Sequence, residues 1–470
     1  MKLFAWILLV FVIIMGAGLF FAAYLIYNHY FRKRIEMETP KIKFMQSFTF
    51  KGITIAILIL LLLIPSTMIQ NLIEERQDRS RETVRKINDK WSYPQTLCAP
   101  LLLVPYTTVK LDKGKKAYYE EHRLYITPKE LKINASLTPE ERYYGIYKAI
   151  LYKSDIHFEG NFSGLAKLKI DNGKLHFVKA QIVIGITDLK GVAQNPVFKI
   201  GDKNLETSIG VVNISSKTLT VNLKDITLTD SLFFDCTMKL NGSGSISFIP
   251  IGQNTTVALN GQWQSPSFIG GFSPESTIDN KQFNAVWNIL SFNREIPEMW
   301  SDNNATDWRD DYFGVNLIQT VDHYQQNMRS AKYALMFIVL TFIVFFFVEI
   351  FTKKPIQFFQ YVLVGIALIL FYSLLLSLSE QIGFGLAYLA ASAATILLIT
   401  VYFYSLIKQR PATFILTGIM ITLYSFLYII LQVEDFALLF GSVFLFVILG
   451  VIMFVSNKIK SGKQIPANEE

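Results

Sequence analysis

The sequence predicts a multi-pass α-helical membrane protein with a large, mainly β, antiparallel sandwich-like domain outside the membrane. Of its 470 residues, 51% are hydrophobic and only 17% are charged, whereas soluble proteins carry about 25% charged residues. The apolar residues collect in long runs near both ends, and the middle of the chain changes to period-two alternation. This pattern excludes a single soluble enzyme, a disordered regulator and a fibrous repeat.

Seven apolar runs are long enough to cross a bilayer, whose core needs about 20 helical residues. They are residues 3–27, 52–70, 333–351, 356–378, 382–407, 412–433 and 436–455. The alternative for the first run is a cleaved signal peptide. Its apolar stretch is too long for one, and its basic cluster follows the run instead of preceding it. We therefore expect a genuine span at residues 3–27.

The basic residues predict the orientation of these spans, because lysine and arginine gather on the cytoplasmic side. They follow the first and last spans and also lie in two short loops, as Lys353, Lys354, Lys408 and Arg410. The opposite short loops carry Glu380, Glu434 and Asp435 instead. The pattern predicts a cytoplasmic C-terminus and an external segment at residues 73–329. That segment holds 30 basic and 29 acidic residues, so the net charge of +8 reflects topology and predicts no nucleic-acid partner.

Helical connections are expected at both ends of the external segment. Val84, Ile87 and Trp91 recur at helical spacing after the second span. A similar stripe leads into the third span and consists of Val321, Tyr324, Met328 and Ala331. Both connections are predicted to be stiff, so that motion of the domain could reach the spans.

In the segment between these two connections, a period-two pattern of side chains predicts antiparallel strands. Apolar and polar residues alternate over residues 218–224 and 232–240. Asn172-Gly173, Asn241-Gly242 and Asn260-Gly261 lie between or beside such runs, where tight hairpins need positive φ.

The sequence shows no motif for a catalytic, cofactor-binding or metal site, and we assign no residue to any of these roles. Cys98 and Cys236 are the only cysteines, and a disulfide between them stays open, because Cys236 occupies a core-facing strand position. His157 and Glu159 share a strand face, which favours a surface pair over a metal site.

Acidic residues offer two weak candidates. Asp302, Asp307, Asp310 and Asp311 lie near Trp300 and Trp308, where a solvated loop is favoured over a cation site. Glu349 is the only acid well within an apolar run, and Lys353 one turn later favours a shared cytoplasmic interface over a functional site.

Small residues in the fifth span favour a packing face over a substrate path, and tyrosines in the later spans are expected to serve as packing or interface anchors. The small residues are Gly383, Gly385, Ala387, Ala390, Ala391, Ser392, Ala393 and Ala394, and the tyrosines are Tyr402, Tyr404, Tyr424 and Tyr428.

The chain after residue 42 resembles the CreD family of bacterial inner-membrane proteins. The matching stretches include FKGITIAILILLLLIPSTMI (50–69), YPQTLCAPLLLVPY (93–106), FNAVWNILSFNREIPEMW (283–300), the long run at 312–350, LLLSLSEQIGFGLAYLAASAAT (374–395) and LYIILQVEDFALLFGSVFLF (427–446). The resemblance implies one span, a large periplasmic domain and five further spans. Residues 1–42 depart from that pattern, and so do Cys98 and Ala99, where a Thr-Gly-like pair is expected.

Together these observations predict the domain organisation. Residues 1–42 form an extra span with a cytoplasmic basic linker, 43–72 a span, 73–329 the periplasmic β-rich domain with helical connections, 330–456 a five-span bundle and 457–470 a cytoplasmic tail. The protein is expected in the bacterial inner membrane.

The family implies an envelope-integrity protein linked to nutrient and cell-wall stress, with no established catalytic residues. We expect a non-enzymatic protein with no cofactor, whose β domain binds a periplasmic protein or an amphipathic envelope component such as a lipid. The alternative is a transporter or lipid-handling protein that uses the bundle and the β domain as a path. A third hypothesis, a periplasmic hydrolase, rests on no motif and would need a pocket with clustered titratable groups. The apolar spans predict contact with the lipid bilayer. The sequence does not identify the ligand and does not predict the oligomeric state.

Overall fold

A computed structural model describes residues 48–432 except 112–116, 171, 215, 228, 303–310, 318–322 and 353, with isolated positions between 439 and 453. The chain divides into two compact units. Residues 1–78 with 322–470 form the helical unit, and residues 79–321 form the β unit. The sequence-based boundaries of the β-rich domain were residues 73 and 329.

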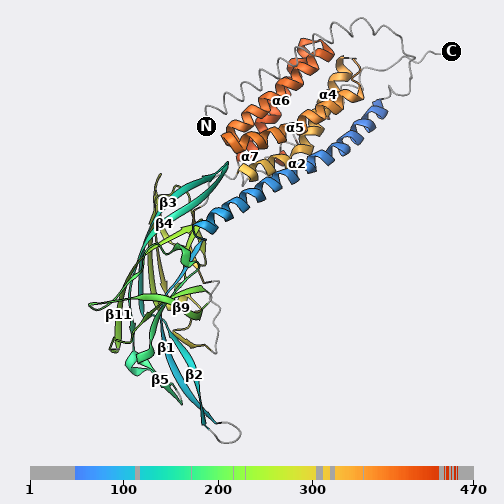
Figure 1. The fold of residues 1–470 in the computed structure, drawn as a ribbon. Coiled ribbons are helices and arrows are strands. Elements are labelled where there is room, and N and C mark those ends of the chain that lie inside the picture. The colour runs from blue at the N-terminus through green and yellow to red at the C-terminus, as the bar shows by residue number, and fades with distance from the viewer. Residues whose placement is uncertain are drawn as a thin grey trace, which may run out of the picture. The chain divides into compact units, whose positions relative to one another are not determined.

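The helical unit contains six described helices, of which the first continues into the β unit (Figure 1). They are α2 (Phe48–Lys90), α3 (His323–Lys332), α4 (Ala334–Thr352), α5 (Phe358–Ile382), α6 (Phe384–Ile407) and α7 (Arg410–Gln432). Four of the described helices are long and apolar enough to cross a membrane, or five if the bent pair α3–α4 forms one span. The predicted span at 3–27 lies outside the described residues, as does most of 436–455.

Helix α2 is apolar both on the face that packs in the helical unit and on its exposed faces. Leu58 and Leu62 of α2 are buried, whereas Leu60, Ile64 and Met68 on other faces are more than half exposed. Such exposed apolar faces suit a lipid environment. On α5, a Cβ atom at Gly365 would lie 2.4 Å from Leu62 Cδ1, so glycine allows α2 to approach closely.

Helix α3 lies in the helical unit, whereas the sequence predicted a helical connection at the end of the external segment. It packs against α5 and α7 in the helical unit, and a 44° bend separates it from α4. Tyr324 and Ala331 of the predicted stripe are buried, but Asn327 and Ser330 on the same face are buried too. Val321 lies outside the described residues. Because two of the buried residues on this face are polar, a pattern based on apolar residues alone did not predict that the face is buried.

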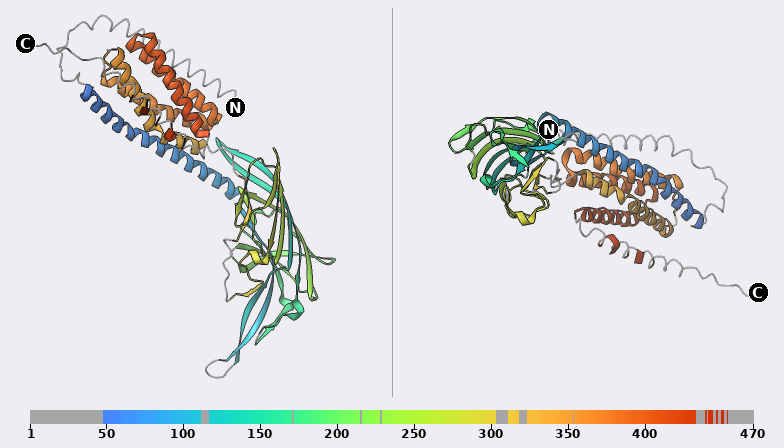
Figure 2. Two further views of the ribbon diagram at one scale, coloured as in Figure 1. Left: turned by 180° about the vertical axis from the view of Figure 1, so that it is seen from behind. Right: turned by 90° about the horizontal axis from the view of Figure 1, so that it is seen from below.

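The β unit consists of two sheets whose inner faces share one hydrophobic core. Among the described residues, the first sheet has ten strands: β1 (Gln95–Leu111), β2 (Ala117–Ile126), β5 (Gly173–Leu175), β6 (Gln181–Ile186), β9 (Thr207–Ile214), β10 (Ser216–Asn222), β12 (Ser245–Phe248), β14 (Pro266–Gly270), β17 (Met299–Ser301) and β18 (Phe313–Leu317). The second has eight: β3 (Glu130–Tyr144), β4 (Tyr147–Ser163), β7 (Val197–Ile200), β8 (Lys203–Leu205), β11 (Ser231–Ser243), β13 (Asn254–Gly261), β15 (Glu275–Ile278) and β16 (Phe283–Leu290). Figure 2 shows that the hairpins β1–β2 and β3–β4 extend from opposite ends of this unit.

The sheets are mixed, which corrects the expectation of purely antiparallel sheets. β1 pairs with β12 in parallel, and β13 pairs with β3 in parallel. Alternation of apolar and polar residues is the same in both kinds of pairing, so it cannot tell them apart. The alternating runs themselves form β10 and β11, whose apolar positions Leu219, Val221, Phe234 and Cys236 are buried.

Two of the three predicted Asn-Gly turns are wrong. Asn172 has a φ of 54° and precedes β5, as a turn requires. Asn241-Gly242 and Asn260-Gly261 instead continue paired strands, within β11 and at the end of β13. Close packing explains Gly242, because a Cβ atom there would lie 2.3 Å from the Tyr152 hydroxyl.

Buried hydrogen bonds fix the segment that follows α2 within the β unit. The group formed by Ser92, Gln95 and Asp188, called the joint below, is almost fully buried. Gln95 Nε2 donates to Ser92 Oγ at 2.7 Å and to the Asp188 carbonyl at 2.9 Å, and the Asp188 N–H donates to Gln95 Oε1 at 3.1 Å. Nearby, the Arg142 guanidinium lies 4.5 Å from the ring of Trp91, the last residue of the predicted stripe.

Candidate functional site

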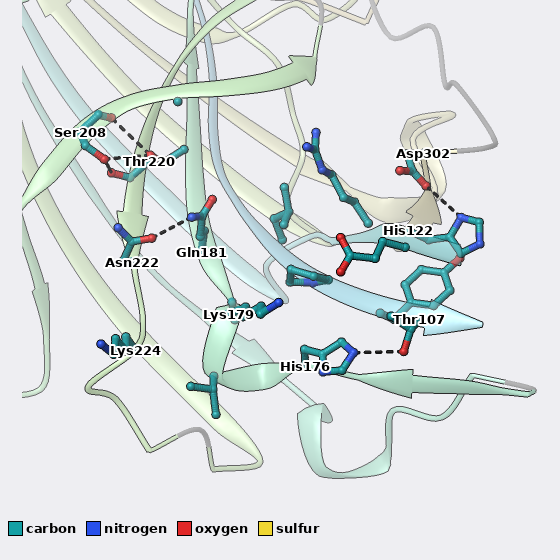
Figure 3. Close-up of a pocket in the computed structure, with 18 of the residues that line it drawn as sticks. Thr107, His122, His176, Lys179, Gln181, Ser208, Thr220, Asn222, Lys224 and Asp302 are labelled. Atoms are coloured by element: carbon teal, nitrogen blue, oxygen red, sulfur yellow. Dashed lines mark hydrogen bonds and ion pairs between the residues drawn. The ribbon is translucent and has the colours of Figure 1, made fainter. Parts of the chain in front are cut away.

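A polar pocket of about 860 Å³ opens on the ten-stranded sheet between β1, β2, β6, β9 and β10 (Figure 3). Its polar and charged lining consists of Thr107, Glu121, His122, Arg123, His176, Lys179, Gln181, Ser208, Thr220, Asn222, Lys224 and Asp302. Figure 3 shows two walls, one with the histidines and one with amide and hydroxyl side chains.

His122 of β2 is one of the two histidines in the first wall. Strand pairing places it opposite Tyr106 of β1, with the two ring centroids 5.0 Å apart. Its Nε2 lies 3.0 Å from Thr108 Oγ1 and 3.4 Å from Glu120 Oε2, and its Nδ1 lies 3.9 Å from Asp302 Oδ1. These neighbours hold the ring, of which only 7% is exposed, in one orientation.

His176 completes this wall from the segment before β6. Its backbone N–H donates to the Pro105 carbonyl at 2.8 Å, and its Nε2 lies 3.1 Å from Thr107 Oγ1. Because β1 supplies both partners, the segment is fixed against the strand that also faces His122.

The second wall is a network of uncharged polar groups. Gln181 Nε2 donates to Asn222 Oδ1 at 2.7 Å, and the hydroxyls of Ser208 and Thr220 lie 3.1 Å apart. A Cβ atom at Gly210 would lie 2.3 Å from Thr220 Cγ2, so only glycine lets β9 pair so closely with β10.

The charges of the pocket are mixed, with a small excess of cations. Arg123, Lys179 and Lys224 line the pocket together with the two acids Glu121 and Asp302. Lys179 and Lys224 are exposed, so both ammonium groups are hydrated and available to a ligand. Such a lining suits a polar or anionic ligand, because an acyl chain would leave these groups without partners.

Titratable groups therefore cluster in a pocket, which is the condition that a hydrolase would need. Thr108, His122 and Asp302 even follow the order of nucleophile, base and orienting acid. Two observations argue against catalysis. The Asp302 oxygen is too distant from the imidazole for a hydrogen bond, and Thr108 is not one of the residues that line the pocket. We assign no catalytic role to these residues.

His157 and Glu159 bind separate partners. His157 Nε2 lies 2.6 Å from Asp235 Oδ2, and Glu159 pairs with Lys132 at 2.8 Å. In the described part of the chain, no group of three or more His, Cys, Asp or Glu side chains could hold a metal ion.

Cys98 and Cys236 are free, buried thiols on different sheets. Burial raises the pKa of each to about 12, so both thiols remain neutral at physiological pH. They act as small apolar residues of the core.

The predicted acidic cluster is described only in part. Asp302 lines the pocket, and Trp300 stacks on Tyr125 with centroids 5.4 Å apart. Asp307, Asp310 and Trp308 lie outside the described residues.

Glu349 of α4 contacts side chains of two other helices. It forms an ion pair with Lys51 of α2, and it accepts a hydrogen bond from the Tyr361 hydroxyl of α5 at 3.1 Å. Lys353, which was expected to share a cytoplasmic interface with Glu349, lies outside the described residues. The Glu349 side chain is 9% exposed, so this pair joins three helices at a largely buried position.

Glu380 lies at the other end of α5 and accepts a hydrogen bond from the Tyr324 hydroxyl at 3.1 Å. Glu434 and Asp435 lie outside the described residues. On α6, the small residues Ala387 and Ala391 are fully buried, whereas Ala393 and Ala394 are exposed. Only one side of the small-residue run therefore packs in the unit.

The aromatic residues of the later spans also divide between packing and exposure. Tyr424 is buried, and its carbonyl accepts a hydrogen bond from the Tyr388 hydroxyl at 2.7 Å. Tyr428 packs on Tyr388 with centroids 5.2 Å apart, whereas Tyr404 is 45% exposed.

Sequence reasoning missed the pocket because its residues are far apart in the chain. His122 and His176 line the same pocket because β1 pairs with both β2 and β5. The single local signal was the pair Thr107 and Thr108, which interrupts the apolar run of β1.

The chain has relatives in one protein family. A model of the family described as "Inner membrane protein CreD" matches residues 47–461. Inner membrane protein CreD of Escherichia coli (strain K12) is 30% identical over 431 residues, which cover 88% of this chain and 95% of that protein. Among solved structures, an M1 zinc metallopeptidase from Deinococcus radiodurans matches 35% of this chain and 38% of its own at 9% identity. Its TM-score of 0.17 carries no argument about fold or function.

Proposed function

The chain belongs to the CreD family of inner membrane proteins, and on that premise we propose that it is a non-enzymatic envelope-integrity protein. In this proposal the β unit lies in the periplasm and binds a polar envelope component, and α2 transmits the bound state to the helical unit. The observation that carries the proposal is the pocket with two fixed imidazoles and a polar lining.

The distribution of charge supports the periplasmic placement. Basic residues gather at one end of the helical unit, where Lys51 pairs with Glu349 and Lys354 donates to the carbonyl of Ile407. The opposite end of α5 carries Glu380. Because basic residues favour the cytoplasm, α2 would begin at the cytoplasmic side and end in the periplasm.

The joint supports transmission through α2. This helix runs without interruption from Phe48 to Lys90. The hydrogen bonds among Ser92, Gln95 and Asp188 then fix the next residues to the β unit. A ligand that shifts the β unit would therefore act on the end of a helix that continues into the helical unit and has Pro65 inside it.

The alternative of a lipid path receives less support from the pocket. A path for acyl chains needs an apolar slot, whereas this pocket presents three cations, two acids and two imidazoles. We therefore favour a saccharide or peptide component over a lipid tail.

Binding of soluble disaccharide-peptide fragments of the cell wall tests the ligand class. We expect saturable binding to the detergent-solubilised full chain, weakened about tenfold by Lys179→Ala with Lys224→Ala, since charge-assisted contacts contribute about 1.5–3 kcal/mol. Lys281→Ala is the matched control, because Lys281 is an exposed lysine outside the pocket. Absence of binding, or equal weakening by the control, would contradict the proposal.

Topology is tested separately by cysteine labelling in intact cells. The native thiols are buried, so single substitutions Lys281→Cys and Arg410→Cys at exposed positions report on each side. An impermeant maleimide should label Lys281→Cys after outer-membrane permeabilisation and should leave Arg410→Cys unlabelled. The reverse pattern would place the β unit in the cytoplasm.

A further inference from the structure

Helix α3 carries a buried polar face that the proposed function does not use. Tyr324, Asn327 and Ser330 lie on it with exposed fractions of 4%, 1% and 0%. Residues three apart share one side of a helix, so these side chains point to the same region of the helical unit. Facing polar partners come from Ser379 and Glu380 at the end of α5.

The hydrogen bonds of Asn327 fix the orientation of its amide. Its Nδ2 donates at 2.7 Å to Ser379 Oγ and at 2.7 Å to the His323 carbonyl. The Ser379 hydroxyl itself donates to the Leu376 carbonyl, so it accepts from Asn327. Both neighbours of Nδ2 are therefore acceptors, and the amide cannot be turned over without losing both bonds.

Two oxygens on this face remain without a partner. Asn327 Oδ1 and Ser330 Oγ are buried and make no hydrogen bond in the described part of the chain. A buried polar atom without a partner costs about 1–3 kcal/mol, so native proteins rarely retain two on one helix face unless something binds them. An amide oxygen can only accept, which requires a hydrogen-bond donor or a cation.

The surroundings of these oxygens favour positive charge. The bend of 44° after Lys332 gives α3 a C-terminal end, where helix carbonyls carry partial negative charge. The Glu380 carboxylate is held beside the same face by Tyr324. Lys332 is exposed and Arg329 is partly exposed, so neither cationic residue of α3 belongs to the buried face.

From this geometry we propose that Asn327 Oδ1 and Ser330 Oγ bind a small monovalent cation at the break between α3 and α4. Neutral amide and hydroxyl oxygens with a single nearby carboxylate suit a monovalent ion. Divalent cations usually require several carboxylates, and no cluster of three metal-binding side chains occurs among the described residues. Broken membrane helices bind ions in this way, through freed carbonyls and polar side chains.

The test compares thermal unfolding of the purified full chain in sodium, potassium and N-methylglucamine chloride at equal ionic strength. We expect sodium or potassium to raise the Tm by about 2–4 °C over N-methylglucamine, because a bound ion stabilises the folded state. Ser330→Ala should abolish this difference while keeping the bonds of Asn327 to Ser379 and His323. Ser392→Ala on α6 is the control, since its buried hydroxyl already donates to the Leu389 carbonyl.

Two outcomes would overturn the proposal. Equal Tm values of the natural chain in all three salts would leave only water or empty space beside these oxygens. A Ser330→Ala variant that keeps the salt response, or that is stabilised equally in every salt, would show that the hydroxyl is merely an unpaired buried group. Asn327→Leu, which also loses two hydrogen bonds, should remove the response as well, and retention of the response in a folded variant would contradict the site.

Discussion

Gln95 and Asp188 bond to each other in both directions. The Gln95 amide donates to the Asp188 carbonyl at 2.9 Å, and the Asp188 N–H donates to Gln95 Oε1 at 3.1 Å. Gln95 is the first residue of β1, five residues after the last residue of α2, whereas Asp188 follows β6. This reciprocal pair fixes the segment that follows α2 to the sheet that carries the pocket, and both residues are almost fully buried.

Gln95→Leu should destabilise the β unit by about 3 kcal/mol, because it leaves the Asp188 N–H and buried carbonyls without partners. Urea unfolding of the solubilised full chain, followed by tryptophan fluorescence, measures the loss. Gln282→Leu at an exposed position is the control and should change stability by less than about 0.5 kcal/mol. Equal stability of the two variants would mean that the joint contributes no more than surface contacts.

The sequence predicted the membrane helices better than it predicted the site, for a physical reason. The runs at 382–407 and 412–433 correspond closely to α6 and α7, because lipid exposure requires an unbroken apolar stretch of fixed length. The burial of α3 left no apolar pattern, because the polar residues Asn327 and Ser330 are buried by helix packing, with hydrogen bonds to Asn327. The pocket depends on strand pairing between distant segments, which leaves no local pattern in the chain.

The two buried thiols predict a loss of stability at alkaline pH. Burial raises their pKa from 9.0 to about 12, so the folded state keeps protons that the unfolded state loses between these values. The unfolded state then binds fewer protons, and stability falls as pH rises through this window. Each thiol should cost about 1.4 kcal/mol between pH 8 and pH 10.

Comparison of the natural chain with Cys98→Ala isolates this effect, since lysine and tyrosine titrations are shared. The variant should lose about 1.4 kcal/mol less unfolding free energy between the two pH values. Identical pH slopes for the two chains would show that the Cys98 thiol ionises as easily in the folded state as in the unfolded state.

Gly160 at the centre of the second sheet should tolerate no side chain. A Cβ atom there would lie 2.2 Å from the Glu130 carbonyl oxygen and 2.7 Å from Phe234 Cζ. Gly160→Ala should therefore cost about 2–3 kcal/mol through overpacking. Gly271→Ala meets nothing within 4 Å and is the matched control. Urea unfolding of both variants decides the question, and a neutral Gly160→Ala would mean that β3 and β4 can separate at little cost.

Lys51 and Glu349 should contribute to the helical unit as a coupled pair. Glu349→Ala leaves the Lys51 charge and the Tyr361 hydroxyl without their partner. Removal of one member of a buried pair costs about 3–5 kcal/mol. Because Lys51 is 25% exposed, water can replace part of the lost interaction, and we expect a smaller loss of about 2 kcal/mol.

A double-mutant cycle with Lys51→Met and Glu349→Leu measures this coupling through unfolding of the full chain in detergent and SDS. The double variant should lose less stability than the sum of the single variants by about 1 kcal/mol or more, because neither charge is then left alone. Lys332→Met, an exposed lysine of the same unit, should combine additively with Glu349→Leu. Additive losses for Lys51 and Glu349 as well would show that α2 is held against α4 and α5 by apolar packing alone.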